Sequence, residues 1–424
     1  MHIPDGYISP IMTLGSGLIT VPVWLIATQK VKSILNNRTI PLLAIFAALS
    51  FTIMMFNIPV PGGTTAHGVG GTLAAIVLGP WAAVIVVSVA LIIQALFFGD
   101  GGILAIFTNC LTMAIILPFV GYATYRIFSS GSPLLSNRRA WAAGIGGYVG
   151  ITVSALVVGV FLGLQPILFS EGSKPLYSPY GLEAAIPAML VAHIFGASIV
   201  EAIITGLGVA YLQKRHPDLL QSLKGVFAGG EPVPEGVASQ RPLWQIIAGT
   251  VTAAVVVLGV VGLVIGGGDP NRFFGGDWSG VAWPDVIGML LFVAVMAAIL
   301  VPIAYLVLPQ RWKRIGATFT ALAVVAPLGL IAPGFAYAEG STEDVANAFG
   351  YVPKGLQDLA GVFSAPLSGY DIPFLQGDSL LRAAIGYEVA GIIGILLCGV
   401  VAIGIGNLLQ RRAGAPPAAE APLA

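Results

Sequence analysis

The chain carries very little charge for its length. Only 9% of its 424 residues are Asp, Glu, Lys or Arg, whereas soluble domains carry about 25%. Apolar runs long enough to cross a bilayer recur along the sequence, and the mean hydropathy is +0.92. Acidic and basic residues balance at 19 each, and no basic domain indicates a nucleic-acid partner. The composition excludes an ordinary soluble domain and predicts a polytopic membrane protein.

Other absences narrow the function. The two cysteines, Cys110 and Cys398, lie in separate apolar runs, which excludes a disulfide framework or a cysteine zinc site. The motif G-x-x-x-x-G-K-S/T is missing, so we do not expect this chain to bind or hydrolyse ATP by that route. The motif H-E-x-x-H is also missing, which argues against a membrane metalloenzyme. No charged series crosses the membrane to carry an ion gradient, so energy for any transport is expected from another subunit.

The apolar runs predict an all-α bundle of about eleven transmembrane spans. Most Lys and Arg residues fall in alternate loops, and the positive-inside rule then places the N-terminus outside and the C-terminus in the cytoplasm. No inverted repeat of the kind found in many secondary transporters is visible, and no strand pattern competes with the helices. The expected spans are residues 10–28, 40–57, 66–79, 81–98, 103–125, 140–165, 185–212, 243–267, 284–308, 315–333 and 383–410.

The third of these spans is unusual. It follows His67 through a Gly-rich stretch and is broken at Gly79-Pro80, which leaves it short for a full crossing at about 1.5 Å per residue. It is therefore expected to be tilted, re-entrant or packed inside the bundle. Its irregular backbone needs protein or water as a neighbour, and such irregularity is typical of a binding site.

Two parts are expected along the chain. Residues 1–225 form a membrane domain with short loops, and residues 226–242 form a cytoplasmic linker rich in Pro, Gly and Glu. Residues 243–412 form a second membrane domain with a long acidic outer loop, about residues 334–382. The Ala/Pro-rich tail, residues 413–424, is expected to be disordered.

The chain begins Met1-His2, and this start is a potential chelate. The terminal amine, the His2 backbone nitrogen and the His2 imidazole can close fused rings around one divalent cation, in a plane that suits Ni(II), Co(II) or Cu(II). His2 is too bulky for ordinary removal of Met1, so the Met1 amine is expected to be free. No basic n-region precedes an apolar stretch, so a cleaved signal peptide is not expected.

His67 lies in a Gly/Thr-rich loop on the same predicted outer side. Its imidazole would complete a square of four nitrogens, although it can equally cap a helix or bond within its loop. Such a site excludes Mg(II), Ca(II) and Mn(II), which prefer oxygen ligands. It must also release protons on binding, because the backbone nitrogen coordinates only after losing its proton. Asp5 is a candidate for orienting an imidazole, or a solvated loop acid.

Four further polar residues stand out within apolar spans. Gln94 and Asn109 are candidates for holding the metal-site loop by hydrogen bonds, or for plain contacts between helices. His193 and Glu201 are two turns apart on one helix, roughly 12 Å, which is too far to share an ion directly. A proton relay, a partner contact and an internal hydrogen bond all stay open for them. The small residues Ala142, Gly146 and Gly150 permit close packing, within the bundle or against a partner.

The motifs together resemble the CbiM/NikM family. The resemblance rests on Met1-His2-Ile3-Pro4-Asp5-Gly6, the His67 segment, Gln94 through Gly102 to Asn109, and the helix from His193 through Glu201 to Thr205. This family comprises the substrate-capturing S components of energy-coupling-factor importers for cobalt and nickel, located in the prokaryotic plasma membrane. The resemblance covers residues 1–215. Residues 327–334 and 350–355 resemble the long, fused members less specifically.

The resemblance implies both a site and partners. Met1, His2 and His67 would bind Ni²⁺ or Co²⁺ as the transported substrate, and this chain would bind no ATP. The partners would be a transmembrane coupling subunit and a pair of cytoplasmic ABC ATPases, whose ATP hydrolysis reorients the S component. A small accessory membrane subunit is a further candidate partner. A self-sufficient metal channel or secondary carrier is the alternative. Neighbouring cobalamin-synthesis genes would argue for cobalt, and urease or hydrogenase genes for nickel.

Overall fold

The computed structural model describes seven stretches of the chain, and the fold and site below are built from these. Three predicted features lie outside the described residues: the linker 226–242, the span 243–267 and the tail 413–424. The described stretches are residues 1–36, 39–60, 64–221, 283–307, 313–331, 336–373 and 380–412.

The N-terminal region, residues 1–221, is a helical bundle. Its first helix starts where the Ser9 side chain accepts a hydrogen bond from the Met12 backbone, which satisfies an otherwise unpaired N–H group. A short π-helical segment, Gln94–Phe98, ends the helix that begins at Pro80, and two others, Cys110–Ile116 and His193–Ala197, interrupt longer helices. The α-helices are α1 (Pro10–Lys32), α2 (Thr39–Met55), α3 (Gly71–Leu78), α4 (Pro80–Ile93), α5 (Ile106–Asn109), α6 (Leu117–Ser129), α7 (Asn137–Leu168), α8 (Leu182–Ala192), α9 (Ser198–Arg215) and α10 (Pro217–Gln221).

The short third span is a helix buried inside the bundle. All eight residues of α3 are buried, so protein surrounds it on every side, as one of the predicted alternatives required. Two small antiparallel hairpins were not predicted by the sequence pattern. They are β1 (Ile58–Val60) with β2 (Thr64–Ala66), and β3 (Ser170–Glu171) with β4 (Lys174–Pro175). The first hairpin leads directly into His67.

Among the described residues, seven helices are long and apolar enough to cross a membrane. Two shorter apolar helices, Thr39–Met55 and Thr320–Leu330, also occur. The protein is therefore all-helical and polytopic. The stripe of small residues on α7 is used inside the bundle: a Cβ at Gly150 would lie 2.8 Å from the Leu117 carbonyl, and one at Gly146 would lie 2.6 Å from the Gly121 carbonyl. Close packing of α6 on α7 explains these glycines.

The C-terminal region joins the bundle through its last helix. Gly394 of α18 lies against the ring of Phe51 in α2, and Gly391 lies against Met55. The Tyr387 hydroxyl donates a hydrogen bond to the Met55 carbonyl at 2.5 Å. The described elements are α14 (Trp283–Val307), α15 (Lys313–Val325), a 3₁₀ segment (Ala326–Ile331), α16 (Thr342–Phe349), α17 (Lys354–Leu359), a 3₁₀ turn (Ser368–Tyr370) and α18 (Leu380–Arg412).

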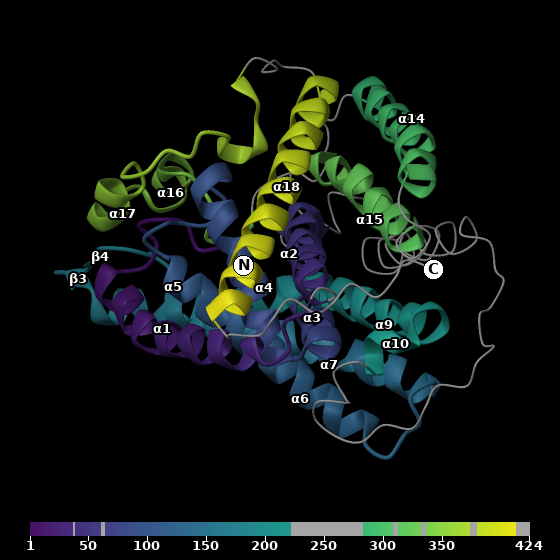
Figure 1. Cartoon of the computed structure of the whole chain (residues 1–424). Helices are drawn as coiled ribbons and strands as arrows, with labels where there is room; N and C mark the ends of the chain where they lie inside the picture. Colours follow the sequence, from purple (N-terminus) through teal and green to yellow (C-terminus); the bar gives the residue numbers. More distant parts are fainter. Residues whose placement is uncertain are drawn as a thin grey trace.

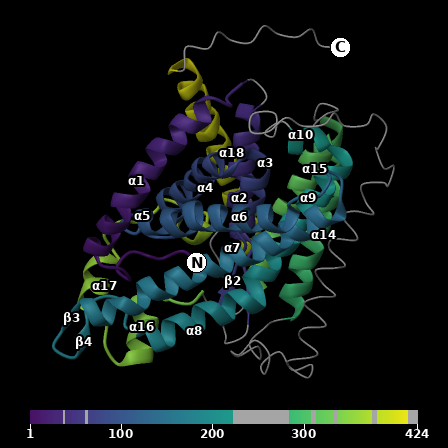
Figure 2. The same cartoon turned by 90° about the horizontal axis from the view of Figure 1, so that it is seen from below.

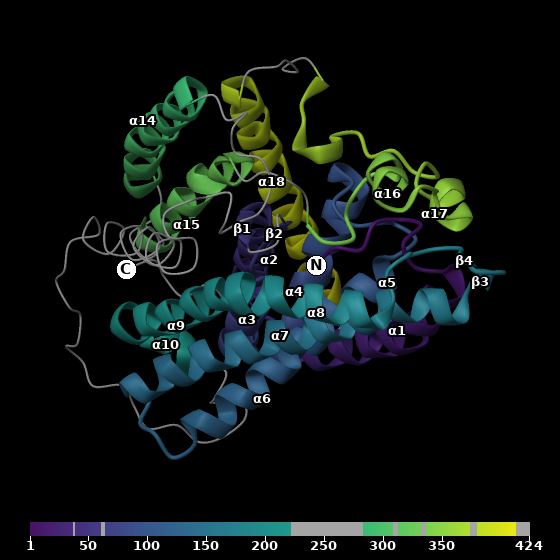
Figure 3. The ribbon, with the colours of Figure 1, turned by 180° about the vertical axis from the view of Figure 1, so that it is seen from behind.

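The N-terminus lies in the middle of the molecule (Figures 1 and 2). The segment 336–373, which carries α16 and α17, lies beside it on the side of the bundle away from α10 (Figures 1 and 3). A parallel bridge between Thr65 and Ala336 joins this segment to the first hairpin. The fold thus gathers the chain start, the His67 loop and a distant C-terminal segment in one place.

Candidate metal site

The start of the chain is held in an extended form by one side chain. The Ile3 N–H donates to Asn109 Oδ1 at 2.9 Å, and Asn109 Nδ2 donates back to the Ile3 carbonyl at 3.1 Å. The Gly102 N–H donates to the same carbonyl at 2.8 Å. Because Asn109 is 1% exposed, these bonds replace the water that the backbone has lost. They fix the two residues that precede Ile3.

Asp5 has a different role from the one expected. Its Oδ1 accepts hydrogen bonds from the Leu104 and Ala105 N–H groups at 2.8 and 3.3 Å, and its Oδ2 accepts one from Ile103 at 3.2 Å. Both oxygens are thus used by the turn that precedes α5. Asp5 therefore holds the N-terminal segment against this turn, whereas the sequence suggested that it orients an imidazole. Burial raises the pKa of Asp5, and these three bonds oppose the rise.

Met1, His2 and His67 come together in the bundle. Each is 3% exposed. The Met1 nitrogen lies 3.4 Å from His67 Nε2, and the His2 and His67 rings stack with their centroids 4.8 Å apart and their planes 27° apart. Residues separated by 66 positions in the chain thus form one compact group of nitrogen donors.

The hydrogen bond of His67 fixes which nitrogen is free. Its Nδ1 lies 2.9 Å from the Gly68 carbonyl, which can only accept, so Nδ1 carries the proton and Nε2 keeps a lone pair. That lone pair points to the Met1 amine. Burial, and then the charge of the N-terminus, hold the pKa of His67 well below its ordinary value. The ring is therefore neutral at pH 7, which is the form that ligates a metal.

A carboxylate that sequence reasoning did not single out stands beside His2. His2 Nδ1 lies 3.0 Å from Asp100 Oδ1, at an angle that makes no hydrogen bond. Asp100 Oδ2 accepts bonds from Gln94 Nε2 at 3.0 Å and from the Tyr370 hydroxyl at 2.5 Å. Burial opposes ionisation, but the interactions with His2 and Tyr370 outweigh it and lower the pKa of Asp100. In the sequence, its position between Gly99 and Gly101 was the one local sign of a tight turn. In the structure, both glycines have positive φ.

A second carboxylate reaches the site from the far end of the chain. Glu339 Oε1 lies 3.4 Å from the Met1 nitrogen, and the Tyr7 hydroxyl donates to the neighbouring Gly340 carbonyl at 2.8 Å. Burial raises the pKa of Glu339, and the Met1 amine opposes the rise. The acids of this loop therefore differ in role: Glu339 faces the site, whereas Asp344 caps α16 by accepting from Ser341.

The structure places His193 and Glu201 outside this group of donors. His193 Nδ1 donates to the Met189 carbonyl at 2.7 Å, one turn earlier on its helix. Glu201 Oε2 accepts from the Val69 and Gly70 N–H groups, both at 2.8 Å. Within the described residues, His193 Nε2 and Glu201 Oε1 have no hydrogen-bond partner. Glu201 thus contacts the His67 loop, although it is not placed as a ligand.

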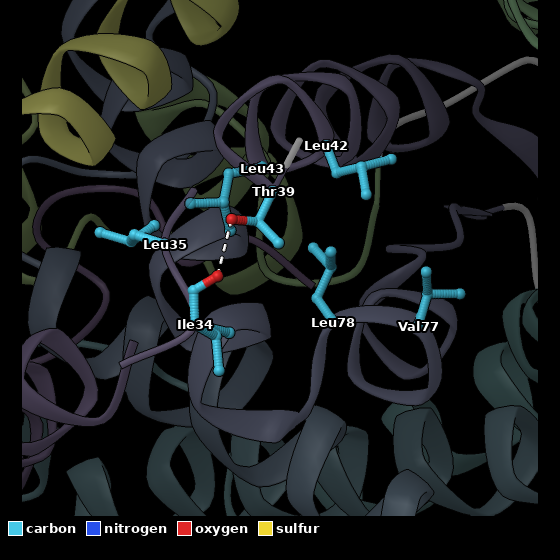
Figure 4. A pocket seen from close by; sticks show the side chains of 7 residues that line it. All are labelled: Ile34, Leu35, Thr39, Leu42, Leu43, Val77 and Leu78. Atoms are coloured by element: carbon cyan, nitrogen blue, oxygen red, sulfur yellow. Dashed lines mark hydrogen bonds between the residues drawn. The ribbon is translucent and has the colours of Figure 1, made fainter. Parts of the chain in front are cut away.

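A small apolar cavity lies elsewhere in the bundle. It is bounded by the ends of α1 and α3 and the start of α2, and its one hydroxyl, on Thr39, donates to the Ile34 carbonyl at 2.8 Å (Figure 4). It offers no nitrogen or carboxylate donor. Among the described residues, no three His, Cys, Asp or Glu side chains form a group able to hold a metal.

The N-terminal group contains backbone nitrogen as well as side-chain nitrogen. A cation bound by the Met1 amine and the His2 backbone nitrogen would close a five-membered ring, and a cation bound by the His2 backbone nitrogen and Nδ1 would close a six-membered ring. His67 Nε2 lies 3.4 Å from the Met1 nitrogen and would supply a fourth nitrogen. Four nitrogens in a plane suit Ni(II), Co(II) and Cu(II).

The chain is similar to known metal transport proteins. A family model described as "CbiM: Cobalt uptake substrate-specific transmembrane region" matches residues 2–219. The fused nickel transport protein NikMN of Rhodobacter capsulatus is 36% identical over 433 residues, which cover 98% of this chain and 100% of that protein. The cobalt transport protein CbiM of Sorangium cellulosum is 33% identical over 189 residues, covering 44% of this chain and 78% of that protein. A crystal structure of a transition metal transporter is 50% identical, covers 54% of this chain and 100% of that chain, and superposes with a TM-score of 0.49.

The family match spans half of the chain, and the fused relative aligns with nearly all of it. Both describe multi-pass transport proteins of prokaryotes and not enzymes. The chain therefore belongs to the CbiM/NikM family, the substrate-specific membrane components of cobalt and nickel transporters.

Proposed function

We propose that this chain captures Ni²⁺ or Co²⁺ at a site of four nitrogens formed by the Met1 amine, the His2 amide and Nδ1, and His67 Nε2. The observation that carries the proposal is the approach of the Met1 nitrogen to His67 Nε2 at 3.4 Å, beside the stacked His2 ring. These donors are buried and come from the chain start and a loop that α3 and the first hairpin hold. No step of the capture requires ATP.

The distances are close to those that a square complex needs. With metal–nitrogen bonds of about 2 Å, adjacent corners of a square lie about 2.8 Å apart. The amine and His67 Nε2 would be adjacent corners, so their separation of 3.4 Å must close by roughly 0.6 Å. His2 Nδ1 must also turn from Asp100 to the metal. Both changes are small movements of side chains and of the terminal residue, and they leave the Asn109 anchor in place.

Two acids favour the cation without ligating it. Asp100 lies beside His2 and Glu339 beside the Met1 amine. Their negative charge attracts a dication and offsets its charge inside the bundle. Binding also releases protons, since the amide must lose its proton and the amine must donate a lone pair. Gln94 supports this arrangement by holding Asp100.

The site excludes hard cations and leaves the choice between nickel and cobalt to experiment. Mg²⁺, Ca²⁺ and Mn²⁺ prefer oxygen ligands. The relative that aligns over the full chain is named for nickel, so Ni²⁺ is the first metal to test. Cu²⁺ outranks both in intrinsic affinity and belongs in the test as a competitor.

The transport cycle requires partners of the family type. We propose a transmembrane coupling subunit and a pair of cytoplasmic ABC ATPases, whose hydrolysis reorients this chain and opens the site inward. The proposed topology has about eleven spans, with the metal site on the outer face and the C-terminus in the cytoplasm. The C-terminal region would then supply the outer segment 336–373 as a cover over the site.

The test is metal titration of the purified chain. Isothermal titration with Ni²⁺ and with Co²⁺ is expected to give about one metal per chain, with the ligand-field absorption of square coordination. His67→Ala removes one corner, and a Gly-Ser extension before Met1 removes the free amine. Each variant is expected to abolish binding.

His193→Gln is the matched control, because it replaces a buried histidine that is not a ligand. It is expected to bind as the wild type does. Undiminished titration in the His67→Ala or the extended chain would contradict the site. Metal uptake by the chain alone in liposomes, without ATP or partners, would favour a self-sufficient channel or carrier instead.

A further inference from the structure

The loop that carries His67 ends at a helix with no cap of its own. His67 is followed by Gly68 and Val69, and Gly70 adopts the left-handed conformation at φ +74° immediately before α3. No side chain within the loop bonds to the first N–H groups of α3. Such unpaired N–H groups attract a negative charge, and a buried helix cannot use water for this.

A carboxylate from another helix lies at this helix start and binds the two N–H groups that immediately precede α3. Glu201 is on the first turn of α9, and its residue is 0% exposed. Its Oε2 accepts both the Val69 N–H and the Gly70 N–H at 2.8 Å. Because bonds from N–H groups to a carboxylate are among the stronger hydrogen bonds, Glu201 fixes the start of α3 from across the bundle.

One peptide unit connects this carboxylate to the histidine ring. The Gly68–Val69 peptide donates its N–H to Glu201 Oε2, and its carbonyl accepts the Nδ1 proton of His67 at 2.9 Å. The order of atoms is Glu201 carboxylate, peptide N–H, peptide carbonyl, imidazole N–H. Hydrogen bonds in such a chain polarise one another. A ligating imidazole whose other nitrogen donates to a polarised carbonyl is both oriented and more basic.

The packing around Gly68 leaves little freedom in this connection. A Cβ at Gly68 would lie 3.1 Å from Ile53 Cγ2 and 3.2 Å from Glu201 Oε2. Glycine therefore permits the carboxylate to approach the backbone. The same contacts restrict rotation of the peptide, so a change at Glu201 reaches the His67 ring.

We propose that Glu201 is a positioning residue for metal capture, which orients and polarises His67 through the Gly68–Val69 peptide. This inference rests on the proposed function, since it concerns one ligand of that site. It assigns Glu201 a part in metal binding without direct contact with the metal. It also connects the site to α9, the helix that continues from Glu201 to Lys214 and Arg215.

The test compares Ni²⁺ affinity and the ligand-field spectrum of the bound metal in Glu201→Gln and in the wild type. The amide keeps the volume and removes the charge. Removing such a supporting partner typically weakens metal binding by about 10–100-fold, and we expect a loss of this size with a shifted absorption band. A purely structural cap would lower the unfolding temperature and leave the bound-metal spectrum unchanged.

Glu388→Gln is the matched control, since Glu388 is a buried carboxylate of α18 that does not touch the His67 loop. It is expected to keep wild-type affinity and spectrum. If Glu201→Gln does not yield folded protein, Glu201→Asp is measured in its place. Asp keeps the charge but is one methylene too short to reach the peptide, so weaker binding and a shifted band are again expected.

His67→Ala separates the two proposals. Retained binding in His67→Ala would overturn the site itself. Lost binding in His67→Ala, together with wild-type affinity and spectrum in the folded Glu201 variants, would overturn the role of Glu201 alone.

Discussion

The N-terminal and C-terminal regions use their membrane helices in different ways. The helical stretch Pro80–Phe98 has 78% of its apolar window buried inside the protein, whereas Val286–Val307 has 17%. The first region is a bundle with its own core, and it holds every proposed metal ligand. The second region exposes much of its apolar surface, and its contribution to the site comes from the segment 336–373. A region whose membrane helix is poorly buried in the protein can therefore still bring residues to the site.

The strongest test of the N-terminal region is pH. Because the amide must lose its proton on binding, Ni²⁺ affinity is expected to fall by at least about 10-fold for each unit by which the pH falls. His67 adds no proton, because burial keeps its pKa below the ordinary value and the ring is neutral at pH 7. Ni²⁺ titration of the whole chain between pH 6 and 8 is expected to give that slope. A flat profile would indicate side-chain ligands only.

The second prediction breaks the anchor of the N-terminal region. Asn109→Ala removes both bonds to Ile3 and leaves its N–H group unpaired, which costs about 1–3 kcal/mol in the free energy of unfolding. Ni²⁺ affinity is expected to fall by about 10–100-fold, because the terminal chelate is no longer held beside His67. Thermal unfolding and titration measure the two effects. Asn137→Ala is the control, because it removes a side-chain amide at the start of α7, away from the site.

The third prediction tests what the C-terminal region adds. Tyr370→Phe removes the hydroxyl that bonds to Asp100 and Gln94 while keeping the ring that stacks on Phe98. Asp100 loses one of its partners, and about a 10-fold loss of Ni²⁺ affinity is expected. Tyr351→Phe, in the same segment, is the control. Equal affinity in both variants would separate the C-terminal region from the metal site.

The fourth prediction concerns charge rather than position. Glu339→Gln keeps the size of the side chain and removes a negative charge 3.4 Å from the Met1 nitrogen. We expect Ni²⁺ to associate a few-fold more slowly, and the difference to shrink as salt is added. Stopped-flow measurements at low and high ionic strength test this. Glu343→Gln, an exposed acid of the same segment, is expected to have a smaller effect.

The smallest effect is expected at the cap of α16. Hydrogen bonds from the Ser341 hydroxyl and backbone N–H lower the pKa of Asp344. A group whose pKa is lowered by folding stabilises above its unfolded pKa, and this contribution disappears as the pH falls through the folded pKa. Asp344→Asn is expected to speed amide exchange in α16 and to leave Ni²⁺ binding unchanged. Weaker Ni²⁺ binding in this variant would show that α16 keeps the segment 336–373 in place over the site.

The membrane class followed from the sequence because it depends on local composition. The Gly-rich stretch that ends at Gly79-Pro80 is short for a full crossing, which left three alternatives for its placement, and the structure buries it as α3. The roles of Asp5 and Asp100 did not follow. Both are acids next to glycine in a loop, and the fold of the loop at 100–105 decides that Asp5 binds its N–H groups and that Asp100 faces His2.

The glycines on α7 also show that the sequence does not identify packing partners. Gly146 and Gly150 indicated close packing, but only the approach of Gly121 showed that the neighbour is α6 and not a partner protein. Glu201 was visible as an intramembrane carboxylate. Its contact with the Val69 N–H spans 132 positions, and no spacing along the chain specifies it.

The sequence by itself determined that this is a membrane protein of the cobalt and nickel transporter family, and it offered Met1-His2 as a candidate chelate. Those properties reside in composition and in short motifs that are read directly. Only the tertiary structure decided that Glu339, 338 positions away, and Tyr370, 276 positions from Gln94, reach the same place. The reason is that such contacts depend on how the helices pack, and one pattern of apolar residues is compatible with many arrangements of the helices.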